Sequence, residues 1–147
     1  MKSVNRNLLS GVLFGLGLIV FMDEVVFHQL LQWHHFYDKS TTFAGIASDG
    51  LLNSFGFFSA VFGLFMLADL GKRQVLHWKR WIGGAFLGAG GFQLYDGIIH
   101  HKLLQLHQIR YQVDILPYDM VWNISAFLML LTGAVIVSNA RRKSQVS

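Results

Sequence analysis

The sequence predicts an all-α integral membrane protein, a four-transmembrane-helix bundle built from two parallel two-helix repeats. Hydrophobic residues make up 53% of the 147 positions and charged residues only 14%, a balance typical of membrane proteins. Four apolar stretches alternate with short polar segments, and one polar motif occurs twice. These observations predict one membrane domain over residues 1–147, with the lipid bilayer as its surroundings.

The repeat is clearest in a motif rich in histidine. Residues 23–35 read DEVVFHQLLQWHH and residues 96–107 read DGIIHHKLLQLH. The pairs that match at an offset of 73 are Asp23 and Asp96, His28 and His101, Gln32 and Gln105, and His34 and His107. We therefore predict one repeat unit at about 8–70 and a second at about 81–139.

The first membrane span begins with the apolar run at residues 8–22. This run is shorter than the roughly 20 residues that cross a bilayer, so we expect the helix to continue through the motif toward His35. A loop is expected at residues 36–48 because turn-forming residues collect there.

Three further spans follow from the remaining apolar stretches. The sequence predicts them at Asp49 to Asp69, at Trp81 through Tyr95 to about Arg110, and at about Asp119 to Ser138. Lysine and arginine concentrate at the amino end, in the central loop and in the carboxyl tail, which predicts that both termini face the cytoplasm. Two units of two spans each then share one orientation and are related by an axis along the membrane normal.

Glycines four residues apart predict how the two units meet. Gly11 and Gly15 in the first unit correspond to Gly84 and Gly88 in the second. Small residues at this spacing let helix backbones approach closely, so we expect the first and third spans to pack together. The short basic clusters do not form the continuous basic face of a nucleic-acid-binding protein, and nucleic acid is not an expected partner.

Carboxylate and imidazole groups concentrate near the outer end of the predicted helices. A rise of about 1.5 Å per residue brings the histidine motifs to the same depth as the aspartates that open the second and fourth spans. Ionisable side chains at such a depth usually serve a function. The predicted metal ligands are Asp23, His28, His34, Asp49, Asp96, His101, His107 and Asp119.

Nitrogen and oxygen donors in a chain without cysteine suit Zn, Fe, Mn or Cu. The polar amides expected to orient the imidazoles are Gln32, Gln105, Asn53 and Asn123. Two other interpretations stay open. Asp49 and Asp119 could cap their helices, and the repeated Asp and His residues could form a structural hydrogen-bond network.

Regular helical geometry sets a condition on such a site. On a straight α-helix His28 lies about 140° around the axis from Asp23, so one helix cannot direct both at one ion. Either two neighbouring sites exist, or the span meets a different partner on each face, or the helix is distorted near Gln32.

The strings MDEVVFHQLLQWHH, SDGLL and LYDGIIHHKLLQLHQ resemble a family of small bacterial multi-span membrane proteins known as domain of unknown function 2243. The resemblance covers nearly the whole chain and implies a location in the bacterial cytoplasmic membrane. Members of this family occur alongside cytochrome oxidase assembly factors, which implies respiratory or assembly-factor proteins as membrane partners.

Three functional hypotheses follow. The first is a membrane protein that binds one or two transition-metal ions and acts in metal handling or in assembly of a respiratory metalloenzyme. The second is an electron-transfer protein with a non-covalent haem held by His28 and His101 as axial ligands. The third is a metal-dependent hydrolase in which Glu24 acts as the catalytic base.

Overall fold

The computed structural model describes the chain from residue 3 to residue 146, and side chains from residue 5 to residue 140. This part of the chain is helical and contains no strand, as the sequence predicts. The elements are α1 (Ser3–Asp23), continued by the π-helix η1 (Glu24–Leu30), α2 (Thr42–Lys72), α3 (Trp78–Tyr95), continued by the π-helix η2 (Asp96–Leu103), and α4 (Leu116–Val146).

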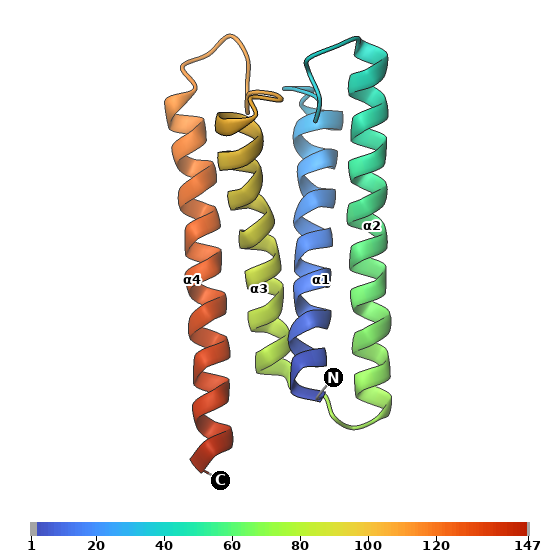
Figure 1. Ribbon diagram of the computed structural model, residues 1–147, viewed down its shortest axis with the longest axis vertical. Helices are drawn as coiled ribbons and strands as arrows, with labels where there is room; N and C mark the ends of the chain where they lie inside the picture. Colours follow the sequence, from blue (N-terminus) through green and yellow to red (C-terminus); the bar gives the residue numbers. More distant parts are fainter. Residues whose placement is uncertain (1–2, 147) are drawn as a thin grey trace.

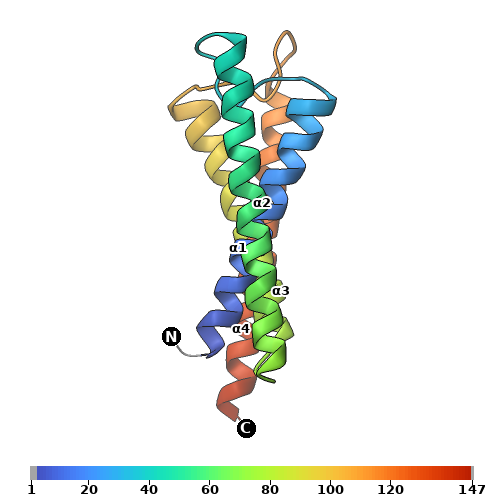
Figure 2. The ribbon, with the colours of Figure 1, turned by 90° about the vertical axis from the view of Figure 1, so that its right-hand side faces the viewer.

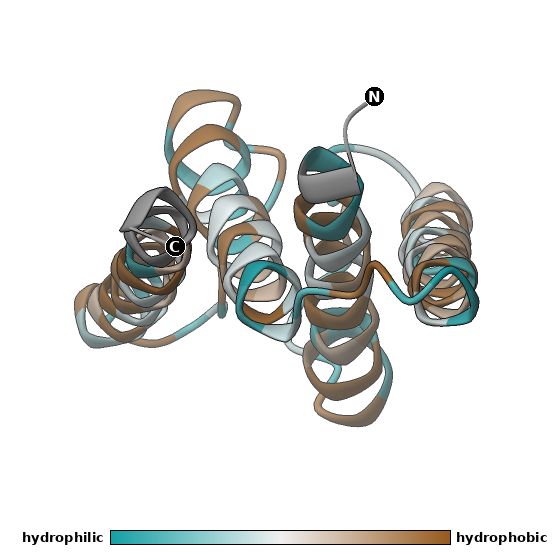
Figure 3. Cartoon of the chain, turned by 90° about the horizontal axis from the view of Figure 1, so that it is seen from below, coloured by the Kyte–Doolittle hydropathy of each residue, from teal (hydrophilic) through white to brown (hydrophobic). Residues whose placement is uncertain are grey.

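The four helices stand side by side in a row (Figure 1). Helices α1 and α3 pack against each other in the middle, α2 packs on α1, and α4 packs on α3. Within the described residues α2 packs on neither α3 nor α4, so the four helices form an open row. The view from below shows α2 and α4 at its two ends (Figure 3).

Glycines bring the two central helices together. A Cβ atom at Gly15 would clash with the backbone of Ala85 on α3, and one at Gly88 would clash with the backbone of Val12 on α1. The two contacts are equivalent in the repeat, because Gly15 corresponds to Gly88 and Val12 corresponds to Ala85, each at an offset of 73. The predicted contact between the first and third helices is therefore confirmed, and it depends on the missing side chains.

Among the described residues, three helical segments are long and apolar enough to cross a membrane. They are Asn5–Leu30, Thr42–Lys72 and Leu116–Ala140. The glycine-rich α3, in the middle of the row, is not among them. On α2 the large side chains of Phe43, Leu51 and Phe65 are exposed, and a continuous apolar face of this kind suits contact with lipid.

The start of α1 and the end of α4 lie at the same end of the helices, together with the connection between α2 and α3 (Figure 1). The other end carries the loop at residues 31–41 and the loop at residues 104–115, and we call it the histidine end. The helices spread apart toward this end (Figure 2).

Several predicted boundaries are wrong. The helix of the first span ends at Leu30 and not near His35, and the helix of the third ends at Leu103 and not near Arg110. Helix α2 begins at Thr42, ahead of the predicted start at Asp49, because the Thr41 hydroxyl accepts a hydrogen bond from the Ala44 amide and caps it.

The predicted capping role of the two aspartates is also wrong. Asp49 lies two turns inside α2, and Asp119 lies in the first turn of α4, which begins at Leu116. Both side chains are buried at the histidine end, facing the imidazoles of the neighbouring helix.

Candidate metal centre

The helices that carry the histidine motifs widen where the motifs begin. Helix α1 continues as a π-helix from Glu24, and α3 does so from Asp96. The hydrogen bond from the Leu31 amide to the Val26 carbonyl (2.9 Å) spans five residues, and Leu104 repeats it with Ile99 (2.7 Å). Such π-segments are rare and often occur at functional sites.

The wider turn solves the geometric problem that a straight helix poses. Residues five apart now share a face, so the His28 Nε2 atom lies 3.7 Å from Asp23 Oδ2, and His101 Nε2 lies 3.1 Å from Asp96 Oδ2. The distortion expected near Gln32 is therefore present, but it begins eight residues earlier, at Glu24.

Past the π-helices the chain folds back over the helix ends. Gln32 has a φ of 51° and Gln105 a φ of 49°, in the left-handed region that ends a helix. The reversal places His34 and His107 in the loops, where their side chains are buried, although the sequence predicts them at the outer ends of longer helices. Both glutamines are exposed, so their contribution is to the backbone turn.

Four imidazoles meet at the centre of the histidine end. The rings of His34 and His107 stack in parallel, with 4.5 Å between centroids and 5° between planes. His28 lies 4.4 Å from His34, and His101 lies 4.7 Å from His107, edge to face in both cases. Each half of the chain therefore contributes one imidazole from its π-helix and one from its loop.

Backbone carbonyls orient the two loop imidazoles. The His34 Nδ1–H group donates to the Ile109 carbonyl (2.9 Å), and the His107 Nδ1–H group donates to the Phe36 carbonyl (2.8 Å). A carbonyl only accepts, so each Nδ1 carries the proton and each Nε2 keeps a free lone pair. The carbonyls thus perform the orienting task that the sequence analysis gives to Gln32 and Gln105.

Three of these imidazoles could hold an ion together. One ring nitrogen from each of His34, His101 and His107 lies within 4.8 Å of the others, and all three side chains are buried. A zinc ion would need each nitrogen at about 2.0–2.1 Å, so the stacked rings of His34 and His107 would have to tilt toward it. We call these three residues the histidine group.

Burial keeps the loop imidazoles neutral. Burial and the neighbouring His107 ring lower the pKa of His34 far below its usual value, and burial lowers the pKa of His107 to about 4. Only a neutral imidazole has a lone pair for a metal, so both rings are ready to bind an ion near neutral pH.

A second group of possible ligands lies beside the first. His28 Nδ1 is 3.1 Å from Glu24 Oε1 and 3.0 Å from Asp49 Oδ1, and all three side chains are buried. The other oxygen of Asp49 lies 2.7 Å from His35 Nδ1, and the Phe36 amide donates to Asp49 Oδ1 (2.7 Å). We call Glu24, His28 and Asp49 the carboxylate group.

The corresponding aspartate of the second half has a different partner. The Lys102 ammonium donates to Asp119, and the nearest imidazole nitrogen, His101 Nδ1, is 3.7 Å away. Asn123 donates to the backbone carbonyl of Asp119 (2.8 Å) and so does not orient an imidazole. Asn53 has a buried Oδ1 without a hydrogen-bond partner.

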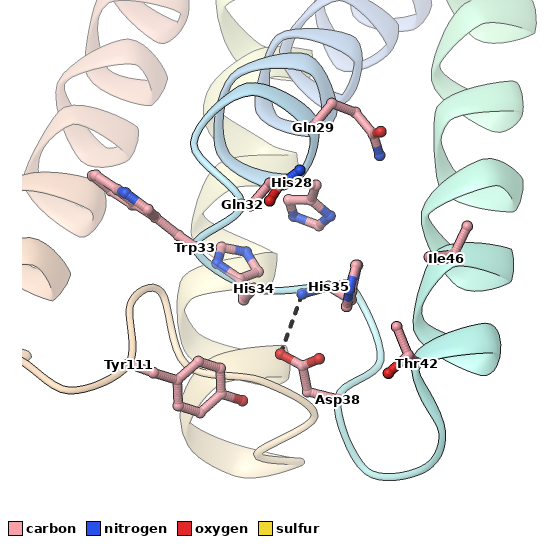
Figure 4. Close-up of a pocket in the computed structure, with 10 residues that line it drawn as sticks. All are labelled: His28, Gln29, Gln32, Trp33, His34, His35, Asp38, Thr42, Ile46 and Tyr111. Carbon is pink, nitrogen blue, oxygen red and sulfur yellow. Dashed lines mark hydrogen bonds between the residues drawn. The ribbon is translucent and has the colours of Figure 1, made fainter.

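A cavity of about 690 Å³ is lined by two of the four imidazoles, those of His28 and His34 (Figure 4). His28, His34 and His35 lie along it, Thr42 and Ile46 enter from α2, and Tyr111 enters from the loop at residues 104–115. The cavity is therefore bordered by η1, by α2 and by the loops of both halves.

Sequence reasoning misses several contacts of this region. It gives Glu24 only a catalytic role, although the side chain lies between His28 and α2, and it gives no role to Lys102. It also overlooks the contact of His35 with Asp49 (2.7 Å). The sequence does mark Glu24 and Lys102, because each differs from its counterpart at an offset of 73. Glu24 corresponds to Gly97, and Lys102 corresponds to Gln29.

Helices with exposed apolar faces and a buried cluster of imidazoles and carboxylates at one end define a helical membrane protein with a candidate metal centre. The chain belongs to the family described as "Predicted membrane protein (DUF2243)", whose sequence profile matches residues 10–140, and the resemblance seen in the motifs is thereby confirmed. No curated protein and no solved structure matches the chain.

Proposed function

We propose that this protein binds a transition-metal ion at its histidine end, through His34, His101 and His107. Three imidazole ligands suit Zn, Cu or Fe, and the notable absence of cysteine from the chain leaves nitrogen and oxygen as the donors. Asp23 and Asp96, buried beneath the imidazoles, are further candidates for ligands or for groups that hold the imidazoles in place.

One observation carries the proposal. His34 and His107 each donate Nδ1–H to a carbonyl, while His107 Nε2 and His101 Nδ1 are buried without a hydrogen-bond partner. His101 Nε2 faces the Asp96 carboxylate at 3.1 Å but makes no hydrogen bond. A buried polar atom without a partner is unfavourable in free energy. An ion coordinated by these nitrogens would remove that penalty. The Nδ1–H hydrogen bonds already hold His34 and His107 in the tautomer that leaves Nε2 able to bind the ion.

The membrane setting extends the proposal. We infer four membrane spans in two copies of one unit, supported by the reciprocal glycine contacts and by the π-helices that recur at an offset of 73. With both termini in the cytoplasm, the ion would lie near the outer face of a bacterial cytoplasmic membrane. A role in metal handling or in the assembly of a respiratory metalloenzyme fits this position.

The test is elemental analysis by mass spectrometry, with a visible absorption spectrum, on the full chain purified in a mild detergent. His107→Ala removes one imidazole of the histidine group, and His77→Ala is the matched control because His77 lies in the connection between α2 and α3. We expect a stoichiometric metal in the wild type and in His77→Ala, and its loss in His107→Ala.

Two results would contradict the proposal. A Soret band that disappears in a His28→Ala variant would favour haem held by His28 and His101. A wild type with native helix content and no bound metal after incubation with Zn²⁺ or Cu²⁺ would favour a structural hydrogen-bond network.

A further inference from the structure

The carboxylate group differs in charge from its counterpart in the second half. Glu24 of the first half corresponds to Gly97, so the first half has one more negative charge. Gln29 of the first half corresponds to Lys102, so the first half has one positive charge fewer. With histidines counted as neutral, these two positions make the first half more negative by two charges. This difference equals the charge of one divalent cation.

The second half balances its buried aspartate with a side chain. Lys102 reaches from η2 to Asp119 on α4 and forms an ion pair with it. In the first half, no lysine or arginine among the described side chains forms an ion pair with Glu24 or Asp49. Among the described side chains, Glu24 and Asp49 face only the imidazoles of His28 and His35 at ion-pair distance, and both carboxylate oxygens of Glu24 are buried without a hydrogen bond.

We propose that Glu24, His28 and Asp49 form a second metal site, which binds a divalent cation in the place that the Lys102 ammonium takes in the other half. One donor atom from each residue lies within 4.8 Å of the others. Two carboxylates and one imidazole favour a harder ion than the histidine group does, with Mn²⁺ and Fe²⁺ as the best matches. The site is additional to the proposed ion of the histidine group and does not depend on it.

The second half has no room for a side chain at the position that corresponds to Glu24. A Cβ atom at Gly97 would lie 2.6 Å from Asn123 Oδ1 and 2.7 Å from Trp122 Cδ1, so any side chain there would collide with α4. In the sequence, Asn53 on α2 is preceded by Leu52, which is smaller than Trp122, the residue that precedes Asn123 on α4. The difference at positions 24 and 97 is therefore built into the packing of the neighbouring helices.

The cavity gives a cation access to this second site. His28 and Gln29 both line it, and His28 belongs to the carboxylate group (Figure 4). The ring of His28 presents Nδ1 to Glu24 and Asp49 and Nε2 toward Asp23. The same ring lies 4.4 Å from that of His34 in the histidine group, so ions bound at both groups would be neighbours.

The experiment is a titration of the chelator-stripped full chain with Mn²⁺, in which free Mn²⁺ is measured by electron paramagnetic resonance. Glu24→Gln removes a ligand charge with little change in size. Gln29→Lys removes no ligand and introduces the ammonium that Lys102 supplies in the second half. Asp114→Asn, an exposed acid in the loop at residues 104–115, is the control.

We expect one Mn²⁺ per chain in the wild type, the same in Asp114→Asn, and a loss of affinity of at least about 10-fold in Glu24→Gln and in Gln29→Lys. His107→Ala, which breaks the histidine group, should still bind Mn²⁺, so the two metal proposals can fail separately. Wild type that binds no Mn²⁺, or a Gln29→Lys variant that binds it as tightly as wild type, would overturn the second site. Gln29 is exposed, so this variant is expected to fold even if Glu24→Gln does not.

Discussion

The two halves of the histidine end share one frame and balance its charge in different ways. Each half has a π-helix, a histidine on it and an aspartate on the adjacent outer helix. In the first half the aspartate meets imidazoles, and in the second it meets the ammonium of Lys102. Under the proposed second site, one half carries its cation as the Lys102 side chain and the other half takes the equivalent cation from solution.

The halves are alike where they meet. His34 donates to the loop of the second half and His107 donates to the loop of the first, at the carbonyls of Ile109 and Phe36, which are also 73 residues apart. The histidine group therefore needs both halves, whereas the carboxylate group lies within the first half alone.

The largest effect is expected where α1 and α3 touch. Gly15→Leu or Gly88→Leu places a side chain against the backbone of the facing helix, where overpacking costs about 1–3 kcal/mol or more. The histidine group and the carboxylate group should then lose their metal together, with a loss of folded protein in size-exclusion chromatography. Gly91→Leu is the control on α3, because a Cβ at Gly91 meets nothing within 4 Å. Unchanged metal content in either variant would show that the halves are independent.

The next effect tests the likeness of the two loops. His34→Gln and His107→Gln remove equivalent imidazoles, so each should weaken Zn²⁺ binding by at least about 10-fold and to a similar degree. Competition with a zinc-sensitive dye measures both affinities. Loss in only one of the two variants would mean that the stacked rings do not share an ion.

The third prediction removes the built-in cation. Lys102→Gln leaves the buried Asp119 without its ion pair, and an uncompensated group of this kind lowers the free energy of unfolding by about 1–3 kcal/mol. Added Mn²⁺ should raise the thermal unfolding temperature of this variant more than that of the wild type. Lys39→Gln, at an exposed position of the other loop, is the control. Equal shifts in the three proteins would break the proposed equivalence of ammonium and ion.

The smallest effect is expected at His35, whose Nδ1 atom contacts Asp49 Oδ2. The corresponding residue in the second half is Gln108. His35→Gln keeps all three ligands of the carboxylate group and removes one group that orients Asp49. Its Mn²⁺ affinity should fall by less than that of Glu24→Gln, as measured in the same titration. A loss as large as that in Glu24→Gln would make His35 a ligand itself.

Much of this arrangement follows from the sequence because it depends on spacing. The offset of 73 and the depth of Asp23, Asp49, Asp96 and Asp119 predict one polar layer, and the structure gathers these residues at one end. Glycines four residues apart predict the central contact for the same reason, since a regular helix repeats its faces.

The remaining features depend on departures from regular geometry. A phase of 100° per residue separates Asp23 from His28, and only the π-helix brings them to one face. The backbone reversals at Gln32 and Gln105 are equally hard to predict, because glutamine rarely adopts a positive φ. The packing around Gly97, which decides where an acid fits, depends on Trp122 in another helix.

The exchange of hydrogen bonds between the loops has a consequence for ancestry. A single two-helix unit could not satisfy its own loop histidine, since the accepting carbonyl belongs to the other half. Two identical chains facing each other would satisfy both, so a homodimer of half-length subunits would already possess the stacked pair of rings. Fusion of two such genes would keep that pair and free each half to change by itself. Glu24 in one half and Lys102 in the other are changes that an obligatorily symmetric dimer could not make.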